Sequence, residues 1–394
     1  METQRCEEEL IMIPGPVHLS EEIMTVLSKQ PPVHYGANWA TLYKSSQDRI
    51  CRQLGADGLS FLIPGSGSLG LEAAAASFCR DKKCLVLSNG WFGKRIEAIT
   101  RCYSYDTVTV DFRAGEEISL EKVDNTLRED RYDVVFVVHV ETSTGMLNPI
   151  TEIAEIAKKS GAIVLVDAVA SAGIEEIDMK AQDIDVLISA SQKGYECPPG
   201  LAIIALSNKA YNSIDDQKQG GSWYTNLARW KEYYKIWNDW HPFPVTLPTN
   251  TIVAIHKILE SLEESGFNNK YHMSQRASRA LQLAFEAMKI SRFNPNGTNS
   301  VSLSAFDTES DFIPSKLVEY VLEKYNVRIA GSLGQIKDRV FRVGHMSKVQ
   351  CQYDSLERLV RGVHDFVKSF RDDIPSEKAV IEILRSSYYS IGGE

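Results

Sequence analysis

The sequence of 394 residues has no apolar run of the roughly 20 residues that a membrane helix requires. It has no block of consecutive basic residues, and its formal net charge is −9, so neither nucleic acid nor an anionic membrane is indicated as a partner. The N-terminal residues are polar and acidic and lack the basic start and apolar core of a secretory signal. These absences predict a cytoplasmic protein that acts on small molecules.

The seven cysteines are scattered and never form a Cys-x-x-Cys pair, so the sequence offers neither a disulfide framework nor a zinc site. Reduced thiols fit the cytoplasm, and we expect no metal. Internal repeats and low-complexity segments are also lacking. Because 43% of the residues are hydrophobic, the chain has enough apolar material for a sizeable core.

Between Phe61 and Leu206, short apolar runs alternate with segments of helical periodicity. Apolar runs of this length are typical of strands that are buried on both faces of a sheet. Their alternation with helices predicts an α/β fold with a mostly parallel sheet. The predicted strands are residues 84–87, 107–110, 134–140, 163–166, 186–190 and 201–206, and the predicted helices between them are 94–103, 120–127 and 151–159.

The whole chain divides into three parts. Residues 1–13, before the rigid Pro14-Gly15-Pro16 turn, are predicted to form an N-terminal arm. Residues 14–262 are assigned to a large domain that contains the sheet. Residues 263–394 are assigned to a small α+β domain with helices at 273–288, 314–325 and 354–370, strands at 301–306 and 340–343, and a polar tail from residue 372 onward.

One carboxylate and one lysine follow two of the predicted strands. Asp167 comes directly after the run 163–166, and Lys193 follows the run 186–190. Side chains beyond the carboxyl ends of neighbouring parallel strands converge on one crevice, so we expect both residues to face the same ligand. Pyridoxal 5′-phosphate (PLP) matches this pair, because it forms a Schiff base with a lysine amine and needs a carboxylate at its pyridine nitrogen. Taken singly, either residue is more often a helix cap or a solvated charge.

Three further loops follow strands of the same array. Residues 65–68, Gly-Ser-Gly-Ser, precede an alanine-rich helical segment, and the free N–H groups of a helix N-terminus favour phosphate. Residues 89–93 offer an aromatic ring, Trp91 or Phe92, that can lie against a planar cofactor. Residues 141–145, Glu-Thr-Ser-Thr-Gly, offer hydroxyls for its ring oxygen. Each loop alone is explained equally well as a turn or a cap, and only their shared order favours a cofactor site.

These motifs resemble those of class V (fold type I) PLP-dependent aminotransferases of the alanine/serine–glyoxylate group. The resemblance runs from Pro14 to about Ser347 and includes the Pro-Gly-Pro start and the motifs GSGSLGLEAA (65–74), GWFGKR (90–95), ETSTG (141–145), DAVASAG (167–173), SQKGYECPPGLA (191–202) and FRVGHMS (341–347). It implies a large domain with a mostly parallel, seven-stranded type of sheet and a small C-terminal α+β domain. The implied reaction moves an amino group from a small alanine- or serine-like amino acid to a 2-oxo acid such as glyoxylate or pyruvate.

The resemblance also implies individual roles. Lys193 would be the Schiff-base lysine and the acid/base of the reaction, with Asp167 at the pyridine nitrogen and Phe92 stacked on the ring. Arg342, together with Gly15, would bind the substrate carboxylate. The remaining cofactor contacts would come from Ser66, Gly67, Ser68, Thr142, Val169, Gln192 and Thr246.

Aminotransferases of this kind are homodimers in which the neighbouring subunit lends a Tyr-x-x-Thr segment to the cofactor phosphate. The resemblance implies that residues 243–246 are this segment, so we expect shared active sites. Residues 220–250, which include this segment, are unusually rich in tryptophan and tyrosine, which favours an interface or a wall of the site over simple core packing.

Phe243 in place of the tyrosine keeps alternatives open. The sequence around it is also similar to pyridoxamine–pyruvate aminotransferases, although the intact 65–68 loop argues against a vitamin substrate. Class V also contains lyases and cysteine desulfurases, and a desulfurase needs a reactive cysteine in a loop that faces the cofactor. No cysteine lies between Cys197 and Cys351, which disfavours that reaction. A silent scaffold of the same fold would have lost the lysine or the aspartate, and both are present.

Overall fold

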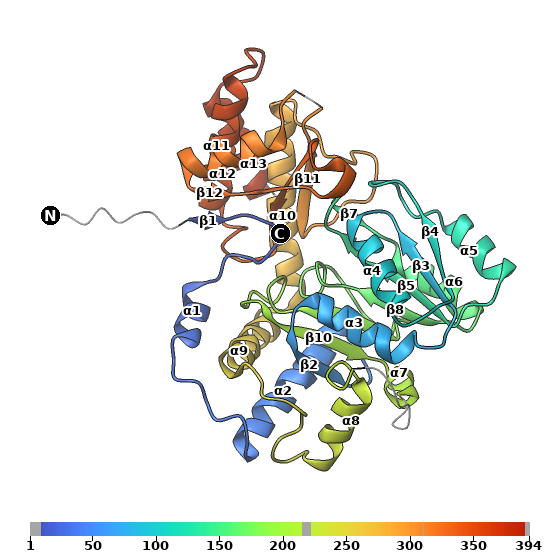
Figure 1. The fold of residues 1–394 in the computed structure, drawn as a ribbon. Helices are drawn as coiled ribbons and strands as arrows, with labels where there is room; N and C mark the ends of the chain where they lie inside the picture. The colour runs from blue at the N-terminus through green and yellow to red at the C-terminus, as the bar shows by residue number, and fades with distance from the viewer. Residues whose placement is uncertain (1–8, 215–221, 310, 391–394) are drawn as a thin grey trace.

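The helices and strands are those of a computed structural model that describes residues 9–214, 222–309 and 311–390 (Figure 1). The strands are β1 (Leu10–Ile11), β2 (Ser60–Gly65), β3 (Cys84–Ser88), β4 (Thr107–Asp111), β5 (Val134–Val138), β6 (Val140–Glu141), β7 (Met146–Leu147), β8 (Ile163–Asp167), β9 (Val186–Ala190), β10 (Gly200–Leu206), β11 (Leu303–Asp307), β12 (Val327–Arg328), β13 (Ala330–Gly331) and β14 (Val340–Gly344). The α-helices are α1 (Glu21–Leu27), α2 (Ala37–Leu54), α3 (Gly67–Phe78), α4 (Trp91–Arg101), α5 (Leu120–Glu129), α6 (Ile150–Lys159), α7 (Asn208–Ser213), α8 (Leu227–Ile236), α9 (Thr249–Ser265), α10 (Phe267–Ala287), α11 (Pro314–Tyr325), α12 (Tyr353–Lys368) and α13 (Glu377–Ser390).

The central sheet has seven strands in the order β2-β10-β9-β8-β5-β3-β4. Strands β4, β3, β5, β8 and β9 run parallel, whereas β10 pairs antiparallel with both β9 and β2. Every residue of β3, β5 and β9 is buried, as their uniformly apolar sequences require in a sheet covered on both faces. The prediction of an α/β fold with a mostly parallel, seven-stranded sheet is confirmed.

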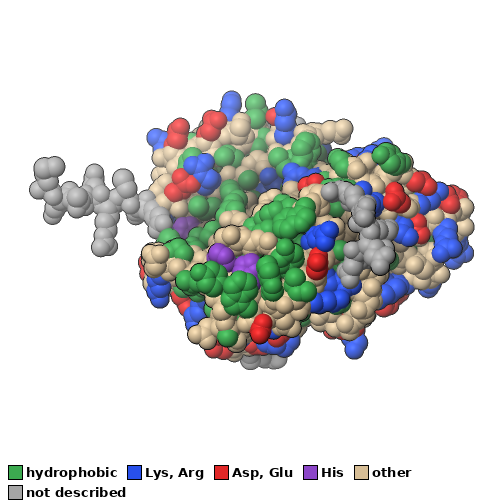
Figure 2. Space-filling view, turned by 60° about the horizontal axis from the view of Figure 1, so that its bottom comes forward, with side chains coloured by type: hydrophobic (Ala, Val, Ile, Leu, Met, Phe, Trp, Pro, Cys, Tyr) green, Lys and Arg blue, Asp and Glu red, His purple; other side chains and the backbone are tan. Residues whose placement is uncertain are grey.

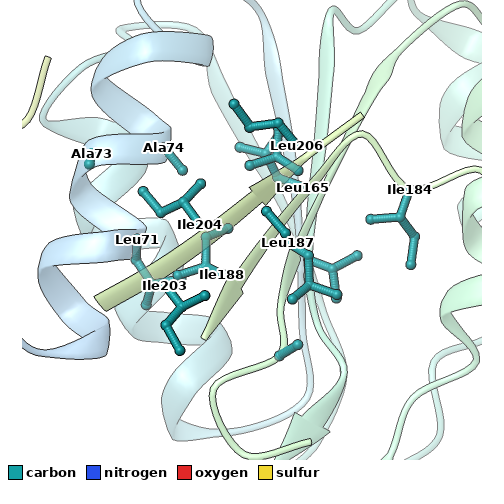
Figure 3. Close-up of a cluster of buried hydrophobic side chains, with 14 of the residues drawn as sticks. Leu71, Ala73, Ala74, Leu165, Ile184, Leu187, Ile188, Ile203, Ile204 and Leu206 are labelled. Atoms are coloured by element: carbon teal, nitrogen blue, oxygen red, sulfur yellow. The ribbon is translucent and has the colours of Figure 1, made fainter. Parts of the chain in front are cut away.

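Helices cover both faces of this sheet. Helices α3 and α4 pack together on one face and α5 and α6 on the other, as right-handed crossovers between these strands require. Figure 3 shows the contact of α3 with the sheet, where Leu71 and Ala74 lie beside Ile188 of β9 and Ile204 of β10. A Cβ at Gly70 would come within 2.8 Å of Ile188, so this glycine lets the helix approach β9 closely. The N-terminus of α3 therefore lies close to the sheet at the carboxyl end of β2.

A second hydrophobic core surrounds α10, which rises from beside α9 into the group formed by α11, α12 and α13 (Figure 1). It also includes the three-stranded antiparallel sheet β11-β14-β13. The rings of Phe285, Phe306 and Phe341 pack at its centre, with the Phe306 centroid 4.6 Å from that of Phe285 and 5.4 Å from that of Phe341. We propose the same division into domains near residue 262, because the first core ends at Leu259 and the chain re-enters the second at Ala277.

The N-terminal segment differs from its prediction as an arm. Leu10 and Ile11 form β1, which pairs in parallel with β12, and Met12 is fully buried in the second core. Residues 10–12 are therefore part of the folded body. Residues 1–8 of the predicted arm lie outside the described residues.

The predicted C-terminal tail was wrong for most of its length, because residues 377–390 form α13. Val380 and Leu384 are buried, and the helix packs against α10 and α12. The apolar residues recur every four positions at Val380, Leu384 and Tyr388, which is a helical pattern that the surrounding charges obscured. Residues 391–394 lie outside the described residues.

The predicted strand 134–140 is interrupted. Strand β5 ends at Val138, and Val140–Glu141 pairs instead with β7. The break occurs at His139, whose N–H donates to the carbonyl of Asp167 at 2.9 Å while its own carbonyl accepts from Asn148 at 2.8 Å. The chain thus turns at the carboxyl edge of the sheet and presents residues 141–145 there. Within the described ranges, no helix is long and apolar enough to cross a membrane.

Replacing Leu384 with alanine should lower the free energy of unfolding by about 2–5 kcal/mol, because the change leaves a cavity in the second core. Urea unfolding followed by circular dichroism measures the loss. Glu382→Ala, on the exposed side of the same helix, is the matched control and should change the value by no more than about 0.5 kcal/mol. Equal effects from the two variants would contradict the packing of α13.

Candidate active site

Asp167 and Lys193 lie at the carboxyl ends of adjacent parallel strands. Asp167 is the last residue of β8, is buried, and accepts a hydrogen bond of 2.9 Å from the N–H of Val169. Lys193 follows β9, and its Nζ donates to the carbonyl of Pro14 and, at 3.5 Å, to that of Gly15. The two charges are close enough for each to affect the pKa of the other. The structure therefore brings this predicted pair together.

Glycines allow the loops around this pair to touch. A Cβ on Gly194 would lie 2.1 Å from the carbonyl oxygen of Ala172, so the turn that carries Lys193 packs directly on the loop after Asp167. A Cβ on Gly67 would lie 2.8 Å from Val169, which brings the start of α3 against the same loop. Any larger side chain at either glycine would separate these segments.

Gly15 also contacts Lys193 directly. Its φ of 93° is a backbone conformation that favours glycine, and a Cβ there would lie 2.4 Å from the Cδ of Lys193. The Pro14-Gly15-Pro16 turn therefore covers one side of the lysine side chain. This contact is why the turn belongs to the candidate site.

The loop before α3 exposes polar groups. Ser66 caps the helix by its backbone, is exposed, and makes no side-chain hydrogen bond to the helix. The first N–H groups of a helix have no partner within the helix, so they remain free for an anion. Gln192 directly precedes Lys193, and its buried Oε1 atom has no hydrogen-bond partner among the described residues.

Arg95 was missed by the sequence analysis. Its Nη1 lies 3.4 Å from the Oγ of Ser68, and its guanidinium carbon lies 4.6 Å from the centre of the Phe92 ring. It also influences the pKa values of Asp167 and Lys193. The signal was its position in α4, one turn after Phe92, which places it on the same side of the helix.

Glu141 was also missed. It is fully buried, and its carboxylate accepts hydrogen bonds from the N–H groups of Phe92 at 2.9 Å and Gly93 at 3.1 Å. The other carboxylate oxygen accepts from the N–H of Ser143 at 3.1 Å and from its Oγ at 2.5 Å. Burial raises the pKa of Glu141, and these hydrogen bonds oppose the rise. The carboxylate thereby fixes the first turn of α4 to the 141–145 loop, at the helix end where a negative charge is favoured.

Arg342 connects the second core to the same loop. From β14, its guanidinium donates twice to the carbonyl of Gly331, at 3.0 and 2.7 Å, and once to that of Thr142, at 2.9 Å. These bonds use three of the five N–H donors of an arginine. Burial lowers the pKa of Arg342 to about 10, and the Glu141 charge opposes this shift. A second link runs from the Oγ of Ser332 to the carbonyl of Ser143, at 2.6 Å.

Charge and burial shift the pKa values of the central pair toward each other. Burial lowers the pKa of Lys193 to about 8, with further lowering by Arg342 and Arg95 and opposition from Asp167. Burial raises the pKa of Asp167 to about 6; Glu141 adds to this rise, whereas Arg95 and Lys193 oppose it. Near neutral pH, Asp167 is therefore mostly ionised, and a usable fraction of Lys193 is the neutral amine.

Among the described residues, Thr246 makes no hydrogen bond to the other predicted site residues. It is exposed and makes no hydrogen bond within the described chain. Phe243 does not point toward the site, because its ring is fully buried with its centroid 5.0 Å from that of Tyr43 and 4.1 Å from that of His241.

Residues 43–336 match the aminotransferase class-V family. An "uncharacterized aminotransferase" of Methanocaldococcus jannaschii is 30% identical over 343 residues, which are 86% of this chain and 88% of the relative. The chain belongs to the class-V aminotransferase family. Another relative of this aminotransferase is the serine–glyoxylate aminotransferase of Methylorubrum extorquens, 27% identical over 87% of this chain and 88% of the relative.

A solved structure with the same fold is the pyridoxamine–pyruvate aminotransferase of Mesorhizobium loti. Its TM-score is 0.90 over 98% of each chain, at 21% sequence identity. The predicted resemblance to class V and the fold type are thereby confirmed. The roles of individual residues in this class-V aminotransferase stay predictions.

Lys193 of the cofactor-free aminotransferase should react by reductive methylation with a midpoint at about pH 8. The neutral amine is the reactive form, so the rate should rise as pH increases through this value, whereas an ordinary lysine has its midpoint at about 10.4. Mass spectrometry of the Lys193 peptide measures the profile. Asp167→Asn removes a negative charge that favours the ammonium form and should move the midpoint lower; a wild-type midpoint near that of ordinary lysine would contradict the burial of the amine.

Proposed function

We propose that this class-V aminotransferase uses PLP to transfer an amino group from a small amino acid, such as alanine or serine, to a 2-oxo acid, such as glyoxylate or pyruvate. The observation that carries the proposal is the position of the Lys193 amine, whose pKa is lowered by burial, beside Asp167 at the end of the neighbouring strand β8. The serine–glyoxylate and pyridoxamine–pyruvate enzymes among the similar proteins support this substrate class.

The residues at the N-terminus of α3 fit the phosphate of PLP. The helix N-terminus, the free hydroxyl of Ser66 and the cation of Arg95 beside Ser68 favour a dianion. The NH₂ group of the half-buried Gln192, the residue before Lys193, can donate a hydrogen bond to this dianion. Gly67 lets α3 approach Val169 and so brings these groups toward the central pair.

The rest of the crevice fits the pyridine ring. Phe92, fixed through its N–H by Glu141, offers its ring for stacking, and Thr142 on the neighbouring loop is the proposed partner of the ring oxygen. Asp167 is buried and mostly anionic at neutral pH, which suits a carboxylate that keeps a pyridine nitrogen protonated. The ring of PLP, when bound, withdraws electrons from the substrate Cα.

In this proposal Lys193 is the acid/base. With PLP held by these residues, the Lys193 amine would move the proton at the substrate Cα, which requires a pKa near the working pH. Arg342 binds the substrate carboxylate with the N–H donors that Gly331 and Thr142 leave free. Because the carboxylate is held at a fixed place, the Cα–H bond is oriented toward Lys193. Gly15, which packs directly against the Lys193 side chain, is the proposed second contact of the substrate carboxylate.

Cys197 and Cys351, the cysteines that lie in or just after the motifs of the site, disfavour the desulfurase alternative. Cys197 and Cys351 are both buried, and burial raises the pKa of Cys351 to about 12 and that of Cys197 above its ordinary range. A thiol in this state is a poor nucleophile at neutral pH. All described cysteines are free, which also suits the reducing cytoplasm in which we propose that the enzyme works.

We propose a homodimer with shared active sites. Figure 2 looks onto the side of the molecule where α8 lies and shows hydrophobic side chains gathered there. Large apolar side chains on and around α8 are exposed in the single chain, namely Val33, Tyr35, Trp223, Ile236, Trp237 and Trp240. A second copy would cover them and bring the exposed Thr246 to the neighbouring cofactor phosphate. Residues 220 and 221 of this region lie outside the described residues.

A spectroscopic screen tests the proposed reaction. The PLP-loaded enzyme is mixed with single amino acids, and then with single 2-oxo acids, while the cofactor absorption is followed through each half-reaction. Alanine or serine should convert the cofactor to its amine form, and glyoxylate or pyruvate should reverse the change. An enzyme that binds PLP but responds to no donor in the screen would contradict the proposed function.

Lys193→Ala should lower transamination at least about 100-fold, because no other described group is placed to move the Cα proton. Borohydride treatment of the PLP-loaded protein should also fail to attach cofactor to the chain. Lys209→Ala, at an exposed lysine, is the control and should behave as the wild type in both assays. Substantial activity in Lys193→Ala would overturn the central assignment.

Shared sites predict complementation between two inactive variants. Lys193→Ala removes the acid/base, and Thr246→Glu places a carboxylate where the partner's phosphate is proposed to bind. Random mixing should yield heterodimers with one complete site each and recover about a quarter of the wild-type activity. Native mass spectrometry verifies subunit exchange. No recovery despite proven exchange, or an active monomer by sizing, would refute shared sites.

A further inference from the structure

A buried ion pair lies directly behind the turn that carries Lys193. The Nζ of Lys270, on α10, lies 2.5 Å from Oε1 of Glu196, and the two side chains are only 3% and 9% exposed. Removing both charges from water costs free energy that the pair recovers only in part, so a buried ion pair adds little net stability. Its presence next to Lys193 calls for another explanation.

The pair binds the backbone of the turn that follows Lys193. The Lys270 ammonium also donates to the carbonyl of Gly194, the residue after Lys193. The N–H of Glu196 donates to the carbonyl of Lys193 itself, at 2.9 Å. Glu196 has a φ of 49°, a left-handed conformation that is costly for a residue with a side chain and persists only where surrounding contacts hold it. The turn is therefore held in place through its backbone.

The same carboxylate also holds the loop that follows Arg342. Oε2 of Glu196 accepts from the N–H of Lys348 at 2.9 Å, a short distance along the chain beyond β14. In that loop, the side chain of Gln350 donates to the carbonyl of Ile13 at 2.9 Å, and the next carbonyl, that of Pro14, accepts from Lys193. A closed ring of contacts thus joins the lysine turn, the N-terminal segment and the arginine strand.

We propose that Glu196 and Lys270 are positioning residues that fix the turn of Lys193 relative to the strand of Arg342. The proposal rests on the proposed function, because it assumes that the position of Lys193 relative to Arg342 aligns the acid/base with a bound substrate. A misplacement of about 1 Å at a reacting group can reduce a rate about 100-fold, so a rigid link between the two elements has a direct kinetic value.

The action of the pair is geometric rather than electrostatic. Its two charges cancel, and the groups that shift the pKa of Lys193 are Arg342, Asp167 and Arg95. Loss of both charges together, in a Glu196→Gln/Lys270→Met double variant, should therefore misplace Lys193 and leave the pH profile of its labelling unchanged. A residue that acted through its charge would move that profile.

Lys270→Met tests the proposal by keeping the length of the side chain and removing the charge. With the PLP-loaded enzyme, kcat should fall about 10- to 100-fold. KM for the amino acid should change less than about threefold, because Arg342 keeps its bonds to Gly331 and Thr142. Lys270→Arg should restore kcat to within about threefold of the wild type by conserving the ion pair.

Lys158→Met is the matched control. Lys158 pairs with Asp185, which is buried, but this pair lies at the amino ends of β8 and β9, away from Lys193. Its loss should destabilise the protein and leave kcat within about twofold of the wild type. An equal fall in kcat for Lys158→Met and Lys270→Met would show that destabilisation alone explains the effect, and would overturn the proposal.

Hydrogen–deuterium exchange of the cofactor-free protein gives a readout that needs no activity. Residues 192–197 should exchange faster in Lys270→Met and at the wild-type rate in Lys158→Met. If Lys270→Met does not fold, Glu196→Gln takes its place, since it preserves the volume and loses the ion pair. Unchanged exchange and unchanged kcat in these variants would refute the positioning role. If the wild-type enzyme transfers no amino group, but residues 192–197 exchange faster in Lys270→Met than in the wild type, only the proposed function is refuted.

Discussion

The contact of Gly194 with the carbonyl of Ala172 is the constraint on which the candidate site depends. Two loops leave adjacent parallel strands, and each carries one of the two ionisable groups at the centre. They can lie one upon the other only because the residue after Lys193 has no side chain. Given that contact, the sheet geometry determines which way Asp167 and Lys193 face. The glycine at the start of α3 repeats the arrangement on the other side of the Asp167 loop.

The crevice that results collects charges of both signs where water has little access. Lys193, Arg95 and Arg342 face Asp167 and Glu141, and each group shifts the pKa of at least one of the others. In such surroundings a charge is tolerated only with partners, which is why both carboxylates are held by backbone N–H groups. The same partners set the protonation of the lysine, so stability and chemistry are determined by one set of contacts.

Much of this arrangement was predictable because it follows from position along strands. Uniformly apolar runs identified the parallel sheet, and the residues just after two of them identified Asp167 and Lys193. Glu141 and Arg95 were not found, because their roles depend on which loop reaches the first turn of α4. The Glu196–Lys270 pair joins residues far apart in sequence, and no local pattern reveals such a contact. Helix α13 did carry a local pattern, but its apolar residues stand among charges that suggested a solvated tail.

The pairing of β1 with β12 ties the order of synthesis to the order of assembly. Leu10 pairs with Val327, so the N-terminal strand has no partner until most of the chain has left the ribosome. The sheet that carries Asp167 and Lys193 can form earlier, because its strands end at residue 206. The turn of Pro14 and Gly15, which covers Lys193, comes shortly after β1, so the strand before this turn finds its partner only once residue 328 has been made. A nascent chain can therefore hold all seven strands of the sheet around Asp167 and Lys193 while the strand that precedes the covering turn still lacks its partner.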